Sequence, residues 1–325
     1  MNIGKLNIFS INDADFEEAA LSVFQYQAVH NDVYKKYLYH LGKKAKNVSA
    51  VPEIPFLPIE FFKRHVIQSG TFHAEAVFGS SGTTGSSTSR HYVKDLGHYK
   101  NSFSAAFKLF YGNPHRYCIL ALLPSYLERE GSSLVYMMQG LIEQSRHPRS
   151  GFYLHEHEKL ATVLRELEQA AQPTILIGVS FALLDFIEKY QLALTHTHVM
   201  ETGGMKGRRE EMIREELHSK LKKGFGLEKI HSEYGMTELL SQSYSRGDGI
   251  FNTPPWMRVY IRDLYDPFEF MPDGRTGAVN IIDLANIHSC AFLQTSDLGR
   301  RVADGSFELL GRSDNSDIRG CNLLL

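Results

Sequence analysis

Residues 117–123 read YCILALL, a continuous apolar run that Pro124 closes. A strand with one face in water alternates apolar and polar residues, whereas a strand buried on both faces is apolar throughout. A second run of this kind, TILIGV at 174–179, follows a proline, and HTHVM at 196–200 supplies a third strand. Since helical segments alternate with these runs, they predict a mostly parallel sheet that helices cover on both faces.

The rest of the chain extends this α/β pattern. We expect helices at 13–41, 98–111, 132–144, 156–171 and 208–223, short strands at 74–78 and 229–232, and an extended, proline-rich connector at 51–58. Ser180 is expected to cap the helix that follows its strand. After about residue 250 the pattern becomes β-rich and partly antiparallel, with strands expected at 278–283, 291–295 and 306–310.

The composition is that of an ordinary globular protein. Of the 325 residues, 43% are hydrophobic and 22% are charged, and the net charge of -2 gives no reason to expect a nucleic-acid partner. No apolar run reaches the ~18 residues that span a bilayer. The three cysteines, Cys118, Cys290 and Cys321, are too few for a disulfide framework. We therefore expect a cytoplasmic protein in which Cys118 and Cys290 are inert core residues.

A loop rich in glycine and hydroxyl groups follows the strand expected at 74–78. Its residues are Ser80, Ser81, Gly82, Thr83, Thr84 and Gly85. Glycine allows the backbone to approach a ligand closely, and successive N–H groups and hydroxyls can surround phosphate oxygens. Taken alone, such a loop is more often an idle surface segment, and it is neither a Walker loop nor a dinucleotide fingerprint.

A second polar segment, HSEYGMTE at 231–238, ends another expected strand. In open α/β sheets, ligands bind beyond the carboxyl ends of the strands. Tyr234 can stack on a base, and Gly235 allows a sharp turn beside it. Thr237 can contact a phosphate, and Glu238 can hold Mg²⁺. Taken alone, such a segment is more often a loop that holds an incidental tyrosine and a helix-capping threonine.

Taken together and in this order, the two segments resemble the adenylate-forming superfamily of acyl-CoA synthetases, luciferases and peptide-synthetase adenylation domains. Three more stretches come in that family's order: Gly203-Gly204 after a strand, TSDLG at 295–299 and GRSD at 311–314. Each motif is weak alone, and their common order is the signal. The resemblance implies an ATP- and Mg²⁺-dependent enzyme with the fold of the family's large N-terminal domain.

The residues that the resemblance places around the nucleotide fall into two groups. Those beside the adenine and the ribose are Gly203, Gly204, Tyr234, Gly235, Asp297 and Arg312. Those beside the phosphates are the loop at 80–85, Thr237, and Glu238, which would also hold Mg²⁺. In this family the tyrosine stacks on adenine and the aspartate holds the ribose hydroxyls.

The sequence departs from the family pattern in two places. A Pro-Lys pair usually follows the phosphate loop, but Ser87-Thr88 stand there, and the nearest bases are Arg90 and Lys94. On position alone, these bases are the candidates to steady the substrate carboxylate, Arg90 first. The family's small C-terminal domain is expected to be missing. We therefore predict a large domain at 1–310, with its β-rich part at about 250–310, and a hinge-like tail at 311–325.

A narrower resemblance covers nearly the whole chain. IPFLP at 54–58, LPSYLER at 123–129 and RGCNL at 319–323 are similar to the acyl-protein synthetase (LuxE) family. In that family a fatty acid is adenylated, passed to a cysteine near the C-terminus and handed to a reductase partner. The resemblance implies that Cys321 is the nucleophile, which suits the reactivity of a thiolate toward a mixed anhydride. It also implies an acyl-accepting reductase or carrier protein as the partner.

Other interpretations stay open. The chain also fits an acyl-CoA or acyl-carrier ligase of the phenylacetate-CoA ligase type, or a non-catalytic descendant that binds a nucleotide or an acyl ligand. The sequence does not fix the acid. HEHE at 155–158 and HTH at 196–198 are weak candidates for a metal site, because no third ligand is evident for either.

Overall fold

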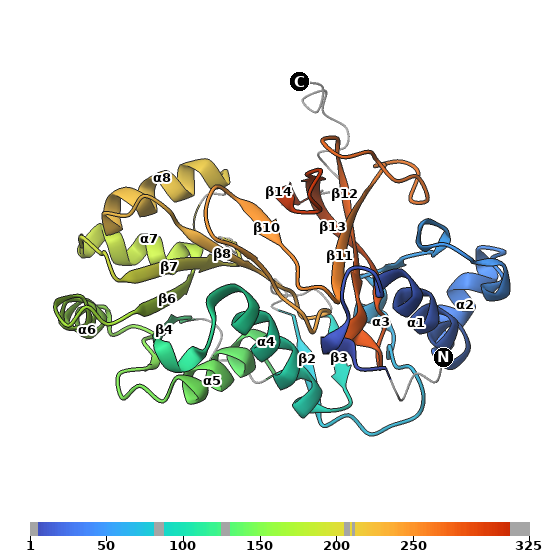
Figure 1. The fold of residues 1–325 in the computed structure, drawn as a ribbon, viewed down its shortest axis with the longest axis horizontal. Coiled ribbons are helices and arrows are strands. Elements are labelled where there is room, and N and C mark those ends of the chain that lie inside the picture. Colours follow the sequence, from blue (N-terminus) through green and yellow to red (C-terminus); the bar gives the residue numbers. More distant parts are fainter. Residues whose placement is uncertain (1–5, 81–87, 125–130, 205–208, 210–211, 313–325) are drawn as a thin grey trace. The chain divides into compact units, whose positions relative to one another are not determined.

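The computed structural model describes residues 6–80, 88–124, 131–204, 209 and 212–312 of the chain. The chain divides into two compact units (Figure 1). The central unit contains residues 76–80 and 95–252, and the terminal unit contains residues 1–75, 81–94 and 253–325. In the part of the chain that the structure describes, no helix is long and apolar enough to cross a membrane.

The central unit is built on one mixed sheet with the strand order β10-β9-β8-β7-β6-β4-β5. Its parallel strands are β4 (Cys118–Leu122), β5 (Gly151–Phe152), β6 (Thr174–Val179), β7 (Thr197–Thr202) and β8 (His231–Tyr234). The antiparallel β9 (Ser243–Ser245) and β10 (Ile250–Asn252) continue it, and β2 (Ala76–Gly79) also belongs to this unit. Every residue of β4 and β6 is buried, which confirms the two apolar runs as strands covered on both faces.

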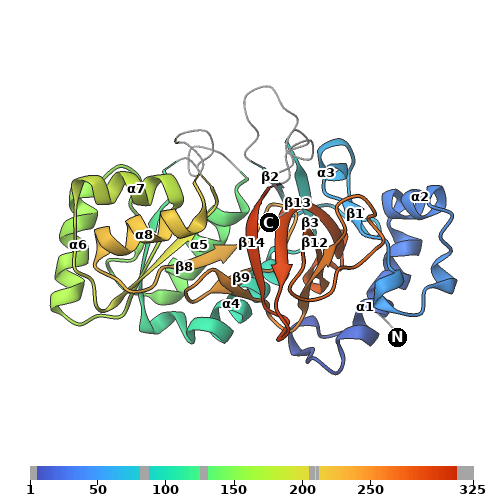
Figure 2. The ribbon, with the colours of Figure 1, turned by 90° about the horizontal axis from the view of Figure 1, so that it is seen from above.

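Helices cover both faces of this sheet. The first face carries α7 (Ser180–Lys189) and α8 (Arg214–Phe225), and the second carries α4 (Leu96–Tyr111) and α5 (Ser133–Ser145) (Figure 1). Figure 2 shows the sheet from the side of α7 and α8. The remaining helix is α6 (His157–Gln169), and Pro114–Arg116 forms a 3-10 turn. Side chains fix two helix starts: Asp95 accepts from His98 N at 3.0 Å, and Ser132 Oγ accepts from Val135 N at 3.3 Å.

Two expectations for this unit were wrong. Ser180 does not cap α7, because the helix begins at Ser180 itself and the hydroxyl instead donates to Gly203 O at 3.1 Å. The charged helix begins at Arg214 rather than at residue 208. Strands β9 and β10 were not expected from the sequence, because three residues are too few to establish a period.

The terminal unit is built on an antiparallel sheet, which confirms the β-rich region after residue 250. Its strands are β11 (Met257–Arg262), β12 (Thr276–Asp283), β13 (Phe292–Arg301) and β14 (Phe307–Arg312). The proline-rich connector supplies β1 (Leu57–Pro58), which pairs in parallel with β13. The other elements are α1 (Phe16–His30), α2 (Asp32–His40), α3 (Phe61–Arg64), β3 (Arg90–Val93) and 3-10 turns at Ile8–Ser10, Ala45–Asn47, Val51–Glu53 and Leu284–Asn286.

A buried glutamine attaches α1 to the sheet of the terminal unit. Gln27 has no solvent exposure, and its Nε2 donates to Asn286 O at 2.9 Å and to Ile287 O at 3.1 Å. Its Oε1 accepts from Ala291 N at 2.9 Å, just before β13. Phe24, one turn earlier on α1, packs edge-to-face on Phe292 with the ring centroids 5.9 Å apart. One polar side chain thereby bonds three buried backbone groups, of which Asn286 O also accepts from Ser289 N at 3.0 Å.

Replacing this glutamine should destabilise the protein strongly. Gln27→Leu keeps the apolar volume but deprives three buried backbone groups of these hydrogen bonds, so we expect the free energy of unfolding to fall by ~2–4 kcal/mol. Gln25→Leu is the matched control, since the exposed Gln25 makes one bond, to Ala45 O, and should cost under about 1 kcal/mol. Urea unfolding of both variants measures the difference, and equal losses would contradict the role given to Gln27.

Candidate active site

Three parallel strands of the central unit end side by side. In the pairing register, Val179 at the end of β6 lies opposite Thr202, and Thr202 at the end of β7 lies opposite Glu233 of β8. Parallel strands run in the same direction, so the segments that follow them emerge at the same edge of the sheet. The structure thereby brings the Gly203-Gly204 turn and the 234–238 segment together.

A half-buried aromatic ring and two constrained glycines form this edge. The ring of Tyr234 packs edge-to-face on Phe251, with the ring centroids 6.1 Å apart and the planes at 69°. A Cβ on Gly235 would lie 2.6 Å from Glu233 Oε1, so alanine does not fit there unless that carboxyl moves. Gly203 has a φ of 66°, which favours glycine, and a Cβ on Gly204 would meet no atom within 4 Å. A partly exposed ring beside accessible backbone suits a planar base.

Glu238 is the candidate Mg²⁺ ligand, and it follows in the same segment. Its side chain is 5% exposed, and the preceding Thr237 is half-buried. A turn in which Leu239 N donates to Met236 O at 3.1 Å holds both residues. Within the described residues, no three His, Cys, Asp or Glu side chains gather as a metal site. Mg²⁺ commonly uses one or two carboxylates and fills its shell with phosphate oxygens and water, so Glu238 fits a Mg²⁺ that arrives with ATP.

A buried carboxylate lies one residue before the end of β7. Glu201 is 4% exposed, accepts from Ser180 Oγ at 3.3 Å and lies 3.6 Å from His218 Nε2. Burial raises the pKa of Glu201, but the hydrogen bond from His218 and the charge of Arg214 outweigh burial and leave the pKa below its ordinary value. Glu201 is therefore an anion that its neighbours stabilise inside the unit.

A second buried carboxyl, Glu233, behaves in the opposite way. Burial raises the pKa of Glu233 to about 7, the hydroxyl of Thr202 lowers it, and the charge of Glu201 raises it. Thr202 Oγ1 donates to Glu233 Oε2 at 2.5 Å. Glu201 and Glu233 were not among the residues expected at the site, although ionisable residues inside buried strands beside two motifs are a usable signal.

The two residues expected at the ribose face each other in the terminal unit. Asp297 of β13 lies opposite Arg312 of β14, and Arg312 Nε is 3.4 Å from Asp297 Oδ1. The Asp297 side chain is 14% exposed and that of Arg312 is 71% exposed. Thr295 Oγ1 accepts from Asp297 N at 3.1 Å, which fixes the backbone at this aspartate. A nearly buried carboxylate beside an exposed guanidinium offers both an acceptor and a donor for sugar hydroxyls.

The remaining expected site residues are divided between described and undescribed parts of the chain. Ser80 directly follows β2, and Arg90 is exposed at the start of β3. The described residues do not include Ser81, Gly82, Thr83, Thr84, Gly85 or Cys321.

The two described cysteines are core residues, as the sequence predicted. Cys118 of β4 and Cys290, just before β13, have no solvent exposure. Burial raises the pKa of Cys118 to about 11 and that of Cys290 to about 12. Because the thiolate is the nucleophile, neither thiol is reactive near neutral pH.

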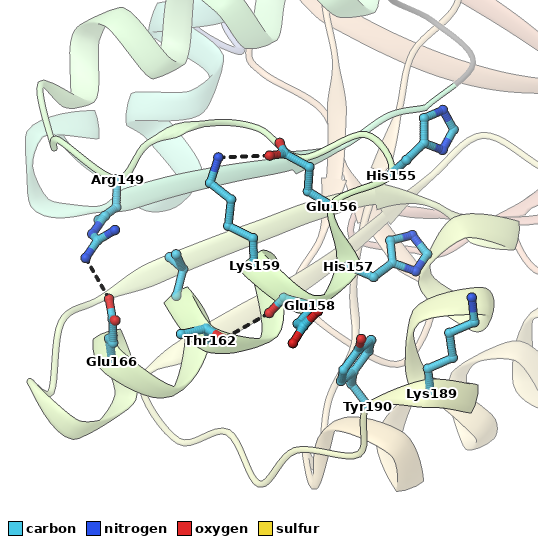
Figure 3. Close-up of a pocket in the computed structure, with 11 residues that line it drawn as sticks. Arg149, His155, Glu156, His157, Glu158, Lys159, Thr162, Glu166, Lys189 and Tyr190 are labelled. Carbon is cyan, nitrogen blue, oxygen red and sulfur yellow. Dashed lines mark hydrogen bonds and ion pairs between the residues drawn. The ribbon is translucent and has the colours of Figure 1, made fainter.

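The HEHE segment lines a surface groove of about 820 Å³ in the central unit (Figure 3). The groove lies between the start of α6 and the end of α7, and two ion pairs cross its wall: Arg149 Nη2 to Glu166 at 2.8 Å and Lys159 Nζ to Glu156 at 3.0 Å. Its charges are of mixed sign. The groove contains none of the residues expected to bind the nucleotide, so it is separate from the edge at β7 and β8.

The fold of the chain is similar to that of solved structures that include an acyl-CoA ligase. Similar solved structures include ATP-bound MatB from Rhodopseudomonas palustris, with 17% identity, a TM-score of 0.53, and coverage of 73% of this chain and 48% of that chain. They also include 2-hydroxyisobutyryl-CoA ligase in complex with 2-HIB-AMP and CoA, with 14% identity, a TM-score of 0.65, and coverage of 93% and 69%. The chain thus spans about half the length of MatB. At these identities the likeness is one of fold.

The family follows from the sequence as a whole. The model of the acyl-protein synthetase (LuxE) family matches residues 12–325, and the chain belongs to that family. This match confirms the resemblance drawn from the motifs. A search of curated proteins found no match.

The raised pKa of Glu233 predicts that the free energy of unfolding depends on pH. The pKa of Glu233 is raised in the folded protein, so its stabilising effect is complete below the unfolded pKa and disappears as pH rises through about 7. Glu233→Gln does not ionise. Relative to the wild type, its free energy of unfolding should therefore increase by ~2–3 kcal/mol between pH 4.5 and pH 8.

The matched control is Glu168→Gln, because Glu168 also accepts from a threonine of β7, at 2.6 Å from Thr197 Oγ1. Burial raises the pKa of Glu168, but this bond and those from His196 N and Thr195 N lower it below its ordinary value. The stabilising effect of the ionised Glu168 carboxylate is therefore complete above pH 5. The difference in the free energy of unfolding between Glu168→Gln and the wild type should be constant from pH 5 to pH 8. A constant difference for Glu233→Gln as well would contradict the raised pKa of Glu233.

Proposed function

We propose that this protein uses ATP to activate a carboxylic acid of the fatty-acid class as an acyl-adenylate. One observation supports the proposal above the others: in a chain of the acyl-protein synthetase family, the Gly203-Gly204 turn and the Tyr234–Glu238 segment emerge together at the carboxyl edge of β7 and β8. That edge is where open α/β sheets bind ligands.

In the proposed first step, a substrate carboxylate oxygen attacks the α-phosphorus of ATP and pyrophosphate leaves. Tyr234 would stack on adenine against the backbone of Gly203 and Gly204, and Thr237 would contact the α-phosphate. Glu238 is the carboxylate that would hold Mg²⁺, an ion that neutralises phosphate charge when bound. Phosphate chemistry of this kind depends mainly on positioning and charge neutralisation, which loops of this type supply.

Three further groups of residues take part in this proposal. The family resemblance assigns the loop at 80–85 to the ATP phosphates and assigns Asp297 and Arg312 to the ribose hydroxyls. Arg90 is assigned to the substrate carboxylate on its position alone. The facing positions of Asp297 and Arg312 on β13 and β14 support their pairing in one role.

In the proposed second step, the thiolate of Cys321 attacks the acyl carbonyl carbon, a C–S bond forms, and the C–O bond to AMP breaks. The thiol proton goes to solvent, and AMP leaves with the bonding electrons. A partner protein, such as a reductase or a carrier, would then collect the acyl group. The burial of Cys118 and Cys290 supports Cys321 as the acceptor, because both buried thiols have raised pKa values.

Loss of the Glu238 charge should slow adenylation. Glu238→Gln is expected to reduce acid-dependent exchange of labelled pyrophosphate into ATP by about 10²-fold or more, the scale of one lost charge-stabilising contact. Glu215→Gln, at an exposed position of α8, is the control and should exchange at the wild-type rate. Exchange that is unchanged in Glu238→Gln would remove Glu238 from the site.

Loss of the Cys321 thiol should separate the two steps. Cys321→Ser is expected to exchange pyrophosphate at the wild-type rate when acid is present, but to retain no labelled acyl group after denaturation. Cys290→Ala, which removes a buried thiol, should keep the label. Intact mass measurement detects the thioester. Stable acylation of Cys321→Ser would contradict the assignment, and acyl-CoA formation by the purified protein would favour a ligase that releases its product.

A further inference from the structure

The carboxyl of Glu233 touches both segments of the candidate site. Its Oε2 accepts from Thr202 Oγ1 at 2.5 Å, and Thr202 directly precedes the Gly203-Gly204 turn. Its Oε1 lies 2.6 Å from the point where a Cβ on Gly235 would stand. The carboxyl therefore lies against the backbone of the turn that carries Tyr234, and it spans from this turn to the end of β7.

Gln242 also lies beside this glycine. Its Cγ is 3.5 Å from the Cβ position of Gly235, and the residue is 4% exposed. Among the described residues, Gln242 Oε1 is a buried acceptor without a hydrogen-bond partner. A neutral carboxyl carries an O–H donor, whereas a carboxylate only accepts. A proton on Glu233 would therefore supply a donor of the kind that this amide oxygen lacks, beside the same glycine.

We propose that Glu233 is a positioning residue whose neutral carboxyl holds the Tyr234–Gly235 turn against the end of β7, between Thr202 and Gln242. The effect of Glu233 on nucleotide binding rests on the proposed function, whereas its role in holding the turn does not depend on that function. Glu233 acts through the backbone of the turn and through Tyr234, and it takes no part in bond making.

The charged and titratable groups around Glu233 favour its neutral form. On β7 the anionic Glu201 repels a second negative charge, and its own charge is stabilised by His218 and Arg214 of α8. Tyr244 of β9 lies opposite Glu233 in register, and Tyr111 of α4 also faces it. Burial raises the pKa of both tyrosines, so both remain neutral and neither offsets the charge of an ionised Glu233.

The sign of the pH effect follows from this arrangement. Burial raises the pKa of Glu233 to about 7, so a rise in pH through this value removes the donor and adds a charge beside Glu201. The turn is then released. If only the neutral form binds nucleotide well, the apparent KM for ATP rises by about tenfold at one pH unit above the pKa, in inverse proportion to the competent fraction.

Two measurements test the proposal on the full-length protein, at pH 6 and at pH 8.5. The first is hydrogen–deuterium exchange of the peptide at 231–240, compared between variants at the same pH so that intrinsic rates cancel. The second is the KM for ATP in acid-dependent pyrophosphate exchange. Glu233→Gln keeps an acceptor for Thr202 and a donor for Gln242 but does not ionise. It should match the wild type at pH 6, and at pH 8.5 it should keep the lower deuterium uptake and the lower KM.

Glu233→Ala should raise both quantities at both pH values, because it removes the contact outright. Glu168→Gln is the control, since it alters the equivalent Glu–Thr bond at the opposite end of β7, and it should follow the wild type throughout. A KM that rises with pH equally in the wild type and in Glu233→Gln would overturn the inference. So would equal deuterium uptake at 231–240 in the wild type and both Glu233 variants.

The two hypotheses fail in different ways. If no acid supports pyrophosphate exchange, the proposed function fails, and the deuterium uptake alone then decides the role of Glu233. If exchange is present but the Glu233 variants change only kcat and leave uptake and KM unchanged, the proposed function stands and the positioning role is wrong.

Discussion

The parallel pairing of β6, β7 and β8 is the constraint on which the candidate site depends. The register places Thr202 opposite Val179 and opposite Glu233, so three chain segments leave the sheet at one edge. Every residue of β6 is buried, as is typical of a parallel strand that helices cover on both faces. A shift of one residue in β8 would turn Glu233 to the other face and Tyr234 away from its present position.

The same pairing places two buried carboxyl groups near each other, and their pKa values shift in opposite directions. Glu201 and Glu233 lie on adjacent strands, and two anions in a buried site repel each other. His218 Nε2 lies 3.6 Å from the Glu201 carboxylate, and the pKa of Glu201 stays below its ordinary value, so Glu201 is ionised. Among the described residues, Glu233 accepts a hydrogen bond from the hydroxyl of Thr202, and burial raises its pKa to about 7. The partners therefore decide which carboxyl carries the charge, since both are almost fully buried.

In the terminal unit, a shift in strand register brings two expected site residues opposite each other. The register of β13 and β14 shifts between Leu298 and Gly299, and a Cβ on Gly299 would lie 2.7 Å from Glu308 O. Glycine is therefore required at the shift, which sets the pairing of Asp297 with Arg312 beyond it. The glycine of the TSDLG motif thus has a structural reason that is independent of any ligand.

The sequence by itself determined the class of fold and the family. A run such as YCILALL identifies a doubly buried strand from local composition, and the motif order identifies the adenylate-forming pattern without any tertiary information. Sequence reasoning also identified Cys118 and Cys290 as core residues, since each lies in an apolar run. These features depend on neighbours along the chain, which the sequence displays directly.

Only the tertiary structure decided the register, the short strands β9 and β10, the hydroxyl bond of Ser180 to Gly203, and the protonation of the buried carboxyls. Each depends on groups far apart in the chain: Glu233 differs from Glu201 because of Thr202 and His218, and not because of its own sequence neighbours. A pKa is set by burial and by nearby charge, and both arise only when the strands are paired.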